Sequence, residues 1–113
     1  MTRHQDPAVF LTAQRASLAQ FVTAQVYGVP LDEMRKPTRG RPVVTRARQV
    51  AIYLAELVFG LTRRQLGQQF GRDPSTIYHA CDLIGGLRKD NLELDSTLRW
   101  MEILLRRAAG MAA

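Results

Sequence analysis

The sequence predicts an all-α protein, a compact bundle of about five helices. Apolar residues recur at intervals of three and four in several segments, as they do on the buried face of a helix. Helix-start signals precede these segments: Asp6-Pro7, Asp73-Pro74 and the capping-box spacing of Thr62 and Gln65. No alternation of apolar and polar residues indicates a strand.

The composition is that of one small globular domain. With 113 residues, of which 46% are hydrophobic, the chain can fill one core, and we treat residues 1–113 as a single domain. Cys81 is the only cysteine, which excludes an internal disulfide and is typical of a reducing compartment. In an apolar helical setting we expect it in the core. Neither a signal peptide nor a membrane-spanning run of about 18 apolar residues is visible, so we expect a cytoplasmic protein.

The apolar spacing, the prolines and the glycines divide the chain into helices and loops. The expected segments are a frayed tail (1–5), an N-terminal helix (6–27), a basic loop (35–45), a helix–turn–helix (61–89) and a C-terminal helix (92–109). Residues 31–34 could form one further helical turn. Thr45 is a suitable N-cap for a long helix that ends at Phe59, where Gly60 suits a left-handed closing position.

The positive charge is concentrated in one part of the sequence. The net charge is +6, and between Arg35 and Arg72 nine basic residues stand against one acid, Glu56. Such a run is often no more than a solvated face. Here it coincides with the helix–turn–helix, and it favours a polyanionic partner, with nucleic acid ahead of acidic lipid or acidic protein. Residues 36–42, rich in arginine and proline, suit insertion into the DNA minor groove.

The second helix of the predicted helix–turn–helix begins with side chains suited to DNA. A short helix (62–70) and a glycine-containing turn (71–73) lead into a helix over 74–89, the element that enters the major groove in this motif. The side chains that would meet base edges are Asp73, Ser75, Thr76, Tyr78 and His79. Asp73 could instead serve only as the N-cap, and His79 could be a packed structural side chain.

The segment resembles a known family, the C-terminal DNA-binding domain of the bacterial chromosomal replication initiator DnaA. The family signature is close to Gly-x-x-Phe-Gly-Gly-Arg-Asp-His-Ser/Thr-Thr-Val-x-His-Ala. This chain has Gly67-Gln-Gln-Phe70-Gly71-Arg72-Asp73-Pro74-Ser75-Thr76-Ile77-Tyr78-His79-Ala80, preceded by an Arg-x-Arg-Gln helix start at Arg46-Ala-Arg48-Gln49. The resemblance covers roughly residues 17–107 and implies a fold like the Trp-repressor class of helix-turn-helix domains.

The resemblance implies roles for residues in and after the basic loop. In the family, an arginine of this loop enters the minor groove, and Arg39 or Arg41 matches it. The Arg-Gln pair that follows the loop contacts phosphates in the family. Arg48 and Gln49 match that pair.

The resemblance also implies roles at the start of the recognition helix. The signature acid and the first hydroxyl residue read bases, and they match Asp73 and Ser75, while Thr76 matches a phosphate contact. Together with the charge pattern, this gives an expected DNA-binding set of Lys36, Arg39, Arg41, Arg46, Arg48, Gln49, Arg63, Arg64, Arg72, Asp73, Pro74, Ser75, Thr76, Tyr78 and His79.

The chain departs from the family pattern at several positions. Pro74 stands where the family has a base-reading histidine, one signature glycine is missing, and the basic loop is one residue longer. Asp82-Leu83 replaces a basic pair that replication initiators often carry late in the recognition helix. Each change weakens DNA contact or alters its sequence preference. The Gly-x-x-x-x-Gly-Lys-Ser/Thr loop of nucleotide-binding proteins is absent, so we expect no ATP binding of that kind.

These observations predict a sequence-selective binder of double-stranded DNA that acts as a transcription factor or replication modulator at the nucleoid. The alternative is a protein-interaction adaptor that keeps the fold but has weakened DNA contact, with replication or regulatory proteins as partners. We expect no enzymatic activity, no cofactor and no membrane partner. We expect no metal site, because His79 and Cys81 lie two apart on a helix and point to different sides. The N-terminal helix is a candidate homodimer surface.

Overall fold

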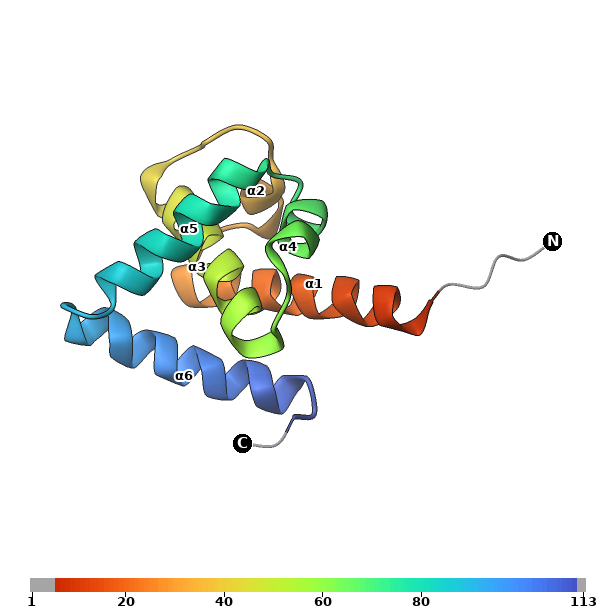
Figure 1. Cartoon of the computed structure of the whole chain (residues 1–113). Coiled ribbons are helices and arrows are strands. Elements are labelled where there is room, and N and C mark those ends of the chain that lie inside the picture. The colour runs from red at the N-terminus through yellow and green to blue at the C-terminus, as the bar shows by residue number, and fades with distance from the viewer. Residues whose placement is uncertain (1–5, 112–113) are drawn as a thin grey trace.

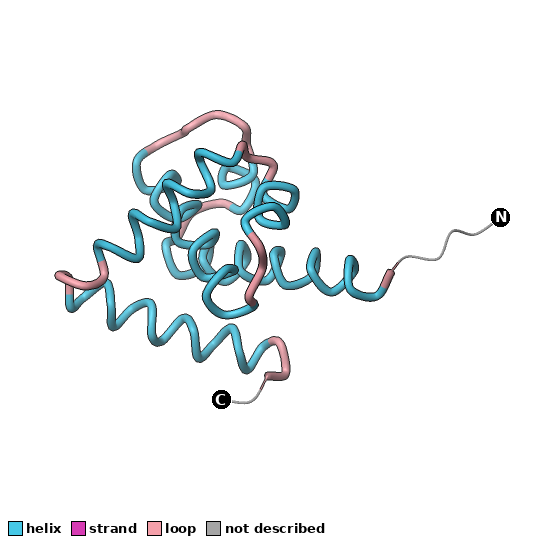
Figure 2. Tube along the Cα trace, viewed as in Figure 1, coloured by secondary structure: helices cyan, strands magenta, loops and turns pink. Residues whose placement is uncertain are grey.

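Residues 6–111 are described by the computed structural model, and they fold into six helices without a strand. The helices are α1 (Pro7–Tyr27), α2 (Leu31–Arg35), α3 (Pro42–Phe59), α4 (Arg63–Phe70), α5 (Pro74–Leu87) and α6 (Leu92–Ala108). Figure 2 shows short connections between the helices and one longer arc between α2 and α3. This architecture confirms the all-α prediction, with α2 as the further helical turn. The tail predicted to fray, 1–5, lies outside the described residues.

Three helices begin where local sequence signals predicted. The Asp6 side chain accepts a hydrogen bond from the amide two residues ahead at 3.0 Å and so caps α1. Thr62 and Gln65 make both bonds of a capping box at α4, at 3.1 and 2.9 Å. Asp73 caps α5 by accepting from the Thr76 amide at 2.9 Å. These contacts span three residues or fewer, so the sequence alone contains the information for them.

The start of α3 shows that the prediction of Thr45 as its N-cap was wrong. The helix begins at Pro42, with Arg41 in the N-cap position and no side-chain cap bond. Proline fits the first helical position because its ring fixes φ and no amide is needed there. Thr45 therefore lies in the first turn, where its hydroxyl donates to the carbonyl oxygen of Arg39 at 2.8 Å.

The other helix boundaries shift by a few residues. Because Arg35 ends α2 and α3 starts early, the basic loop comprises residues 36–41 rather than 35–45. α5 ends at Leu87, two residues before the predicted end, and Gly85 and Gly86 lie in its last turn. α6 ends one residue before the predicted position.

The core is built around α3, which packs chiefly against α1 and α5. The large side chains sealed in it are Val50, Ile52, Leu54, Leu66, Ile77, Ile84, Leu98, Met101 and Leu105. A second, smaller cluster includes Met34, Val44 and Ala51 and seats α2 and the first turns of α3 against α1. The basic loop is therefore anchored at both ends on buried apolar residues.

Residues 6–111 show neither a membrane span nor a metal centre. No helix in this range combines the length and the apolarity needed to cross a bilayer. No three potential metal-ligating side chains gather there. Cys81 lies in the core as expected, and burial raises the pKa of its thiol to about 12, so the thiol stays protonated and unreactive.

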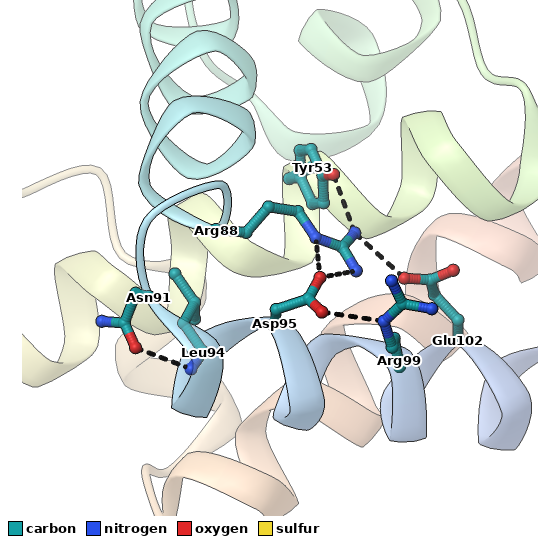
Figure 3. A network of polar contacts seen from close by, with 7 residues as sticks. All are labelled: Tyr53, Arg88, Asn91, Leu94, Asp95, Arg99 and Glu102. Atoms are coloured by element: carbon teal, nitrogen blue, oxygen red, sulfur yellow. Dashed lines mark hydrogen bonds and ion pairs between the residues drawn. The ribbon is translucent and has the colours of Figure 1, made fainter.

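Arg88 follows α5 directly and joins the end of that helix to α3 and α6 (Figure 3). Its guanidinium donates to the Tyr53 hydroxyl at 2.9 Å and to the carboxylates of Asp95 and Glu102 at 2.9 and 3.0 Å. Asp95 also accepts from Arg99 at 2.8 Å. Burial opposes the charge of Arg88, but its three hydrogen-bond partners outweigh that effect and raise its pKa. The C-terminal end of α5 is thus held by charged contacts.

The same contacts act on Asp95. Hydrogen bonds from Arg99 and Arg88 hold the pKa of this carboxyl below its usual range. A carboxyl with a lowered folded-state pKa contributes stability that is complete near neutral pH and is lost as the pH falls through that pKa.

Replacing Arg88 with methionine should lower the free energy of unfolding by about 3 kcal/mol, because two carboxylates lose their shared, largely buried cation. Urea unfolding measures the change, and Arg107→Met, a substitution at an exposed residue of α6, should alter it by less than about 0.5 kcal/mol. The gap between wild type and Arg88→Met should shrink in acid as Asp95 becomes protonated. A gap of constant size across the acid range would contradict the role given to Asp95.

Candidate nucleic-acid interface

A groove of about 960 Å³ runs between the basic loop, the start of α3 and the N-terminal half of α5. Figure 1 shows the arc between α2 and α3 passing beside the first turns of α5. Sites for small molecules of this size are lined mostly by apolar and aromatic side chains. The described residues that line this groove include no phenylalanine, tyrosine or tryptophan, and four arginines and three hydroxyl residues contribute to it, which suits an extended polyanion.

The groove brings together many, but not all, of the residues predicted to bind DNA. Those that line it are Arg39, Arg46, Arg48, Gln49, Arg72, Asp73, Ser75, Thr76 and His79. Those that do not line it are Lys36, Arg41, Arg63, Arg64, Pro74 and Tyr78. Thr45 and Leu83 also line the groove but were not in the predicted set. The hydroxyl of Thr45 was the available signal, and it was assigned to a helix cap instead.

The first turn of α5 presents exposed polar groups held by one carboxylate. Asp73 accepts from the Thr76 amide and, at 2.7 Å, from the Ser75 hydroxyl. The Ser75 hydroxyl and then the Thr76 amide hold the pKa of Asp73 below its usual range, so the cap stays ionised. Because Ser75 donates its proton to Asp73, its lone pairs remain free to accept from a base amine.

His79 lies on the same face of α5, one turn further along. Its side chain is exposed and lines the groove, so the interpretation of His79 as a packed structural residue is corrected. Ile77, two residues earlier, is buried on the side of the helix that faces the core, and the buried Ala80 lies between that side and the groove. The 3.6-residue period places Ser75, Thr76 and His79 together because they are three and four positions apart.

Arg48 does not lie on the surface where the resemblance implied a phosphate contact. Its side chain is buried beneath the basic loop, with the residue 7% exposed. The guanidinium donates to the carbonyl oxygens of Met34 at 2.8 Å, Glu33 at 3.1 Å and Arg39 at 3.1 Å. Burial, and secondarily the charge of Arg72, lowers its pKa. The donors that would bind a phosphate are occupied by the protein's own main chain.

Arg72, in the turn between α4 and α5, reaches the same segment. It donates to the carbonyl oxygen of Pro37 at 3.0 Å and to that of Met34 at 3.3 Å, and it also contacts the Lys36 carbonyl. Burial lowers its pKa. The turn of the helix–turn–helix is thereby bonded directly to the basic loop.

The sequence matches the family described as "Bacterial dnaA protein helix-turn-helix" over residues 17–84, a range that contains α2, α3, α4 and most of α5. The chain belongs to this family. The match spans the basic loop, the capping box and the whole groove-lining part of α5. The resemblance inferred from the signature residues is therefore confirmed.

Relatives of this DnaA-type domain are much longer proteins. The chromosomal replication initiator protein DnaA of Acinetobacter baumannii is 34% identical over 88 residues, which are 77% of this chain and 19% of that protein. The protein of the same name from Leptothrix cholodnii is 35% identical over 89 residues, 77% of this chain and 17% of its own length. That from Acinetobacter baylyi is 36% identical over 73 residues, 64% of this chain and 16% of its own length. The chain thus spans less than a fifth of these relatives.

Several cations of the DnaA-type domain are engaged within the protein. Arg63 pairs with Glu56 at 3.0 Å and with Asp82 at 3.5 Å, and it lies 4.3 Å from the centroid of the Tyr78 ring. These contacts tie α4 to α5 and turn Arg63 and Tyr78 away from the groove. They also give Asp82, a departure from the family pattern, a partner on the neighbouring helix.

The two basic-loop arginines also differ in their partners. Arg41 pairs with Glu33 at 3.0 Å. Arg39 is exposed, lines the groove, and has no side-chain hydrogen bond to residues 6–111. Of the two candidates for the minor groove, Arg39 is the one with a free guanidinium.

Proposed function

We propose that this chain binds double-stranded DNA sequence-selectively and acts on it as a transcription factor or a replication modulator at the nucleoid. The observation that carries the proposal is the single basic groove lined by both Arg39 of the basic loop and the first turns of α5. Because the basic loop and α5 line the same protein groove, they can enter the minor groove and the neighbouring major groove of one DNA duplex together. The DnaA relationship supports the same reading, and the proposed role is binding without catalysis.

Within this proposal, α5 lies in the major groove and the basic loop in the minor groove. Ser75 and His79 face base edges, with Asp73 beside them, while Arg39 enters the minor groove, where the negative potential attracts a guanidinium. Arg46 lines the groove, and its guanidinium has no hydrogen-bond or ion-pair partner among the described residues. Phosphate is a suitable acceptor for it.

The alternative role, a protein adaptor, draws on one feature of the groove. Leu83 contributes an apolar side chain to the lining, which suits a DNA backbone poorly, and Asp82 beside it is an exposed acid outside the groove. DNA binding is the better-supported role, because four arginines line the same groove and Asp73 is the one acid among the described residues of its lining. A replication or regulatory protein is the competing partner.

Fluorescence anisotropy at several salt concentrations tests the DNA proposal. With about five phosphate contacts, log affinity should fall against log salt with a slope of about −4 to −5, and the preferred duplex should bind far more tightly than random duplex. The preferred duplex comes from selection on randomised sequences. Equal affinity for selected and random duplexes would overturn the sequence-selective role and favour the adaptor.

Pro74 provides a test of how α5 is oriented. Pro74 is exposed at the first position of the helix, where it cannot donate a hydrogen bond to a base. Pro74→His should shift the selected sequence toward the site bound by replication initiators, with about 1–3 kcal/mol of discrimination at one base pair. Gln68→His, which adds a histidine on α4 outside the groove, is the control. Identical selected sequences for wild type and Pro74→His would show that this position does not face the bases.

We further propose that α1 pairs two copies of the chain. Phe10 and Phe21 are 59% and 52% exposed, and between them Gln14 and Ser17 lie exposed on the same side of the helix. The spacing of this uncharged stripe is the same read in either direction. In an antiparallel two-fold pair, Phe10 would therefore meet Phe21 of the partner subunit, and Gln14 would meet Ser17 of the partner subunit. Figure 1 shows the first turns of α1 projecting from the rest of the molecule, open to such a partner.

Sedimentation equilibrium measures this pairing. Wild type should reach a dimer as concentration rises, and Phe21→Glu should remain a monomer, because the charge would be buried against the aromatic ring of the other copy. Leu92→Glu, at an 85% exposed position on α6, should leave the dimer intact. A wild type that stays monomeric up to its solubility limit would contradict the pairing.

A further inference from the structure

Two arginines from different parts of the fold donate hydrogen bonds to the same stretch of main chain. Arg48 extends from α3 and Arg72 from the turn before α5, and both donate to the carbonyl oxygens of Met34 and Lys36. Among residues 6–111, neither guanidinium is hydrogen-bonded or ion-paired to a carboxylate. The positive charges are compensated by peptide carbonyls at the end of α2 and in the basic loop.

Burying two like charges close together costs free energy, so the arginines need hydrogen-bond acceptors in well-defined positions. Burial lowers the pKa of both arginines, and the charge of Arg72 acts against that of Arg48. Four bonds from Arg48 and three from Arg72 to carbonyls offset this cost, although the buried Nε of Arg72 has no partner among the described residues. Arg48 alone bonds the carbonyl of Glu33 in α2 and that of Arg39 in the basic loop, six residues later in the sequence. A planar guanidinium spreads five donors over three nitrogens and so reaches carbonyls that lie apart, whereas an ammonium group offers three donors from a single nitrogen.

We call Arg48 and Arg72, with the carbonyls that they bond, the arginine clamp. The clamp holds the backbone at Arg39 through Arg48 and leaves the Arg39 side chain free. The Arg39 carbonyl accepts from Arg48 at 3.1 Å and from the Thr45 hydroxyl at 2.8 Å. The next residue, Gly40, has φ of 75°, a left-handed conformation that turns the chain back toward α3. The exposed Arg39 side chain therefore leaves a backbone that is held from two directions.

We infer that Arg48 and Arg72 are positioning residues that set the reach of Arg39 relative to α5. The inference rests on the proposed DNA binding and deepens it. Because Arg72 belongs to the turn of the helix–turn–helix, the basic loop and the recognition helix are joined directly, not only through the core. The two DNA-reading elements then meet the duplex at a fixed offset, without ordering the loop at the moment of binding.

A double-mutant cycle separates positioning from direct phosphate contact. Arg48→Lys keeps the charge, but a single nitrogen cannot reach all four carbonyls that the Nε, Nη1 and Nη2 atoms of Arg48 bond. The substitution should weaken binding to the preferred duplex by roughly tenfold, and by much less in an Arg39→Ala background, since the two residues act as one unit. Arg72→Lys should behave in the same way and carries the test should Arg48→Lys fail to fold. Arg107→Lys, the matched change on an exposed residue of α6, should leave affinity unchanged.

A second measurement needs no DNA. In the free protein, NMR order parameters of the amides of Thr38, Arg39, Gly40 and Arg41 should fall in Arg48→Lys and Arg72→Lys, while those of α5 stay high. Unfolding measurements on the same samples show that the fold is retained. Arg107→Lys should leave all of these order parameters at their wild-type values.

The outcomes are distinguishable. Full affinity in Arg48→Lys and Arg72→Lys, or losses that simply add to that of Arg39→Ala, would overturn the positioning role. Unchanged order parameters in the loop would overturn it whether or not DNA binds. Failure of the DNA proposal itself would be seen in wild type alone, as equal affinity for selected and random duplexes. The two arginines would then still order the loop, but they would have no role in DNA binding.

Discussion

Backbone carbonyls at the end of α2 and in the basic loop accept hydrogen bonds from Arg48, a cation sealed beneath them. Without these carbonyls the buried guanidinium would lack compensation for its lost water, and without Arg48 the carbonyl of Glu33 would lose its side-chain donor. Each side therefore depends on the other. The path of the basic loop and the outward position of Arg39 depend on this contact.

The recognition helix is held at both ends by charged groups of opposite kind. At its start, the ionised Asp73 occupies the positive end of the helix and orders the Ser75 hydroxyl. Past its end, the Arg88 cation connects α5 to α3 and α6 through Tyr53, Asp95 and Glu102. Between these points, Ile77 and Ile84 fasten its inner face to the core. A helix held in this way can present its outer face to a duplex with little freedom to rotate.

The net charge of +6 overstates the basic surface available to DNA. Carboxylates pair with four of the arginines, namely Arg41, Arg63, Arg88 and Arg99. Two more, Arg48 and Arg72, donate hydrogen bonds to backbone carbonyls. The groove itself is left with Arg39 and Arg46 as its available cations. Two available arginines beside three hydroxyl residues and apolar lining are consistent with a binder that depends on shape as much as on charge.

The amino-acid sequence alone determined the features that rest on short-range chemistry. The starts of α1, α4 and α5, the helix–turn–helix and the DnaA family signature are all readable because their residues are neighbours in the chain. The core position of Cys81 also followed, since the apolar period of α5 fixes which side faces inward. Nine of the residues predicted for the DNA-binding set do line the groove.

Long-range packing decided which of those residues are free to act. Arg72 meets the Pro37 carbonyl across 35 positions of sequence, and Arg88 meets Tyr53 across the same separation. An arginine looks alike in sequence whether it is solvated, ion-paired or buried on carbonyls. Which partner it binds depends on the acceptors that the fold brings within about 3 Å of the guanidinium, and neither periodicity nor composition gives these distances. For that reason the burial of Arg48, the diversion of Arg63 and the free side chain of Arg39 became visible only once the helices were packed together.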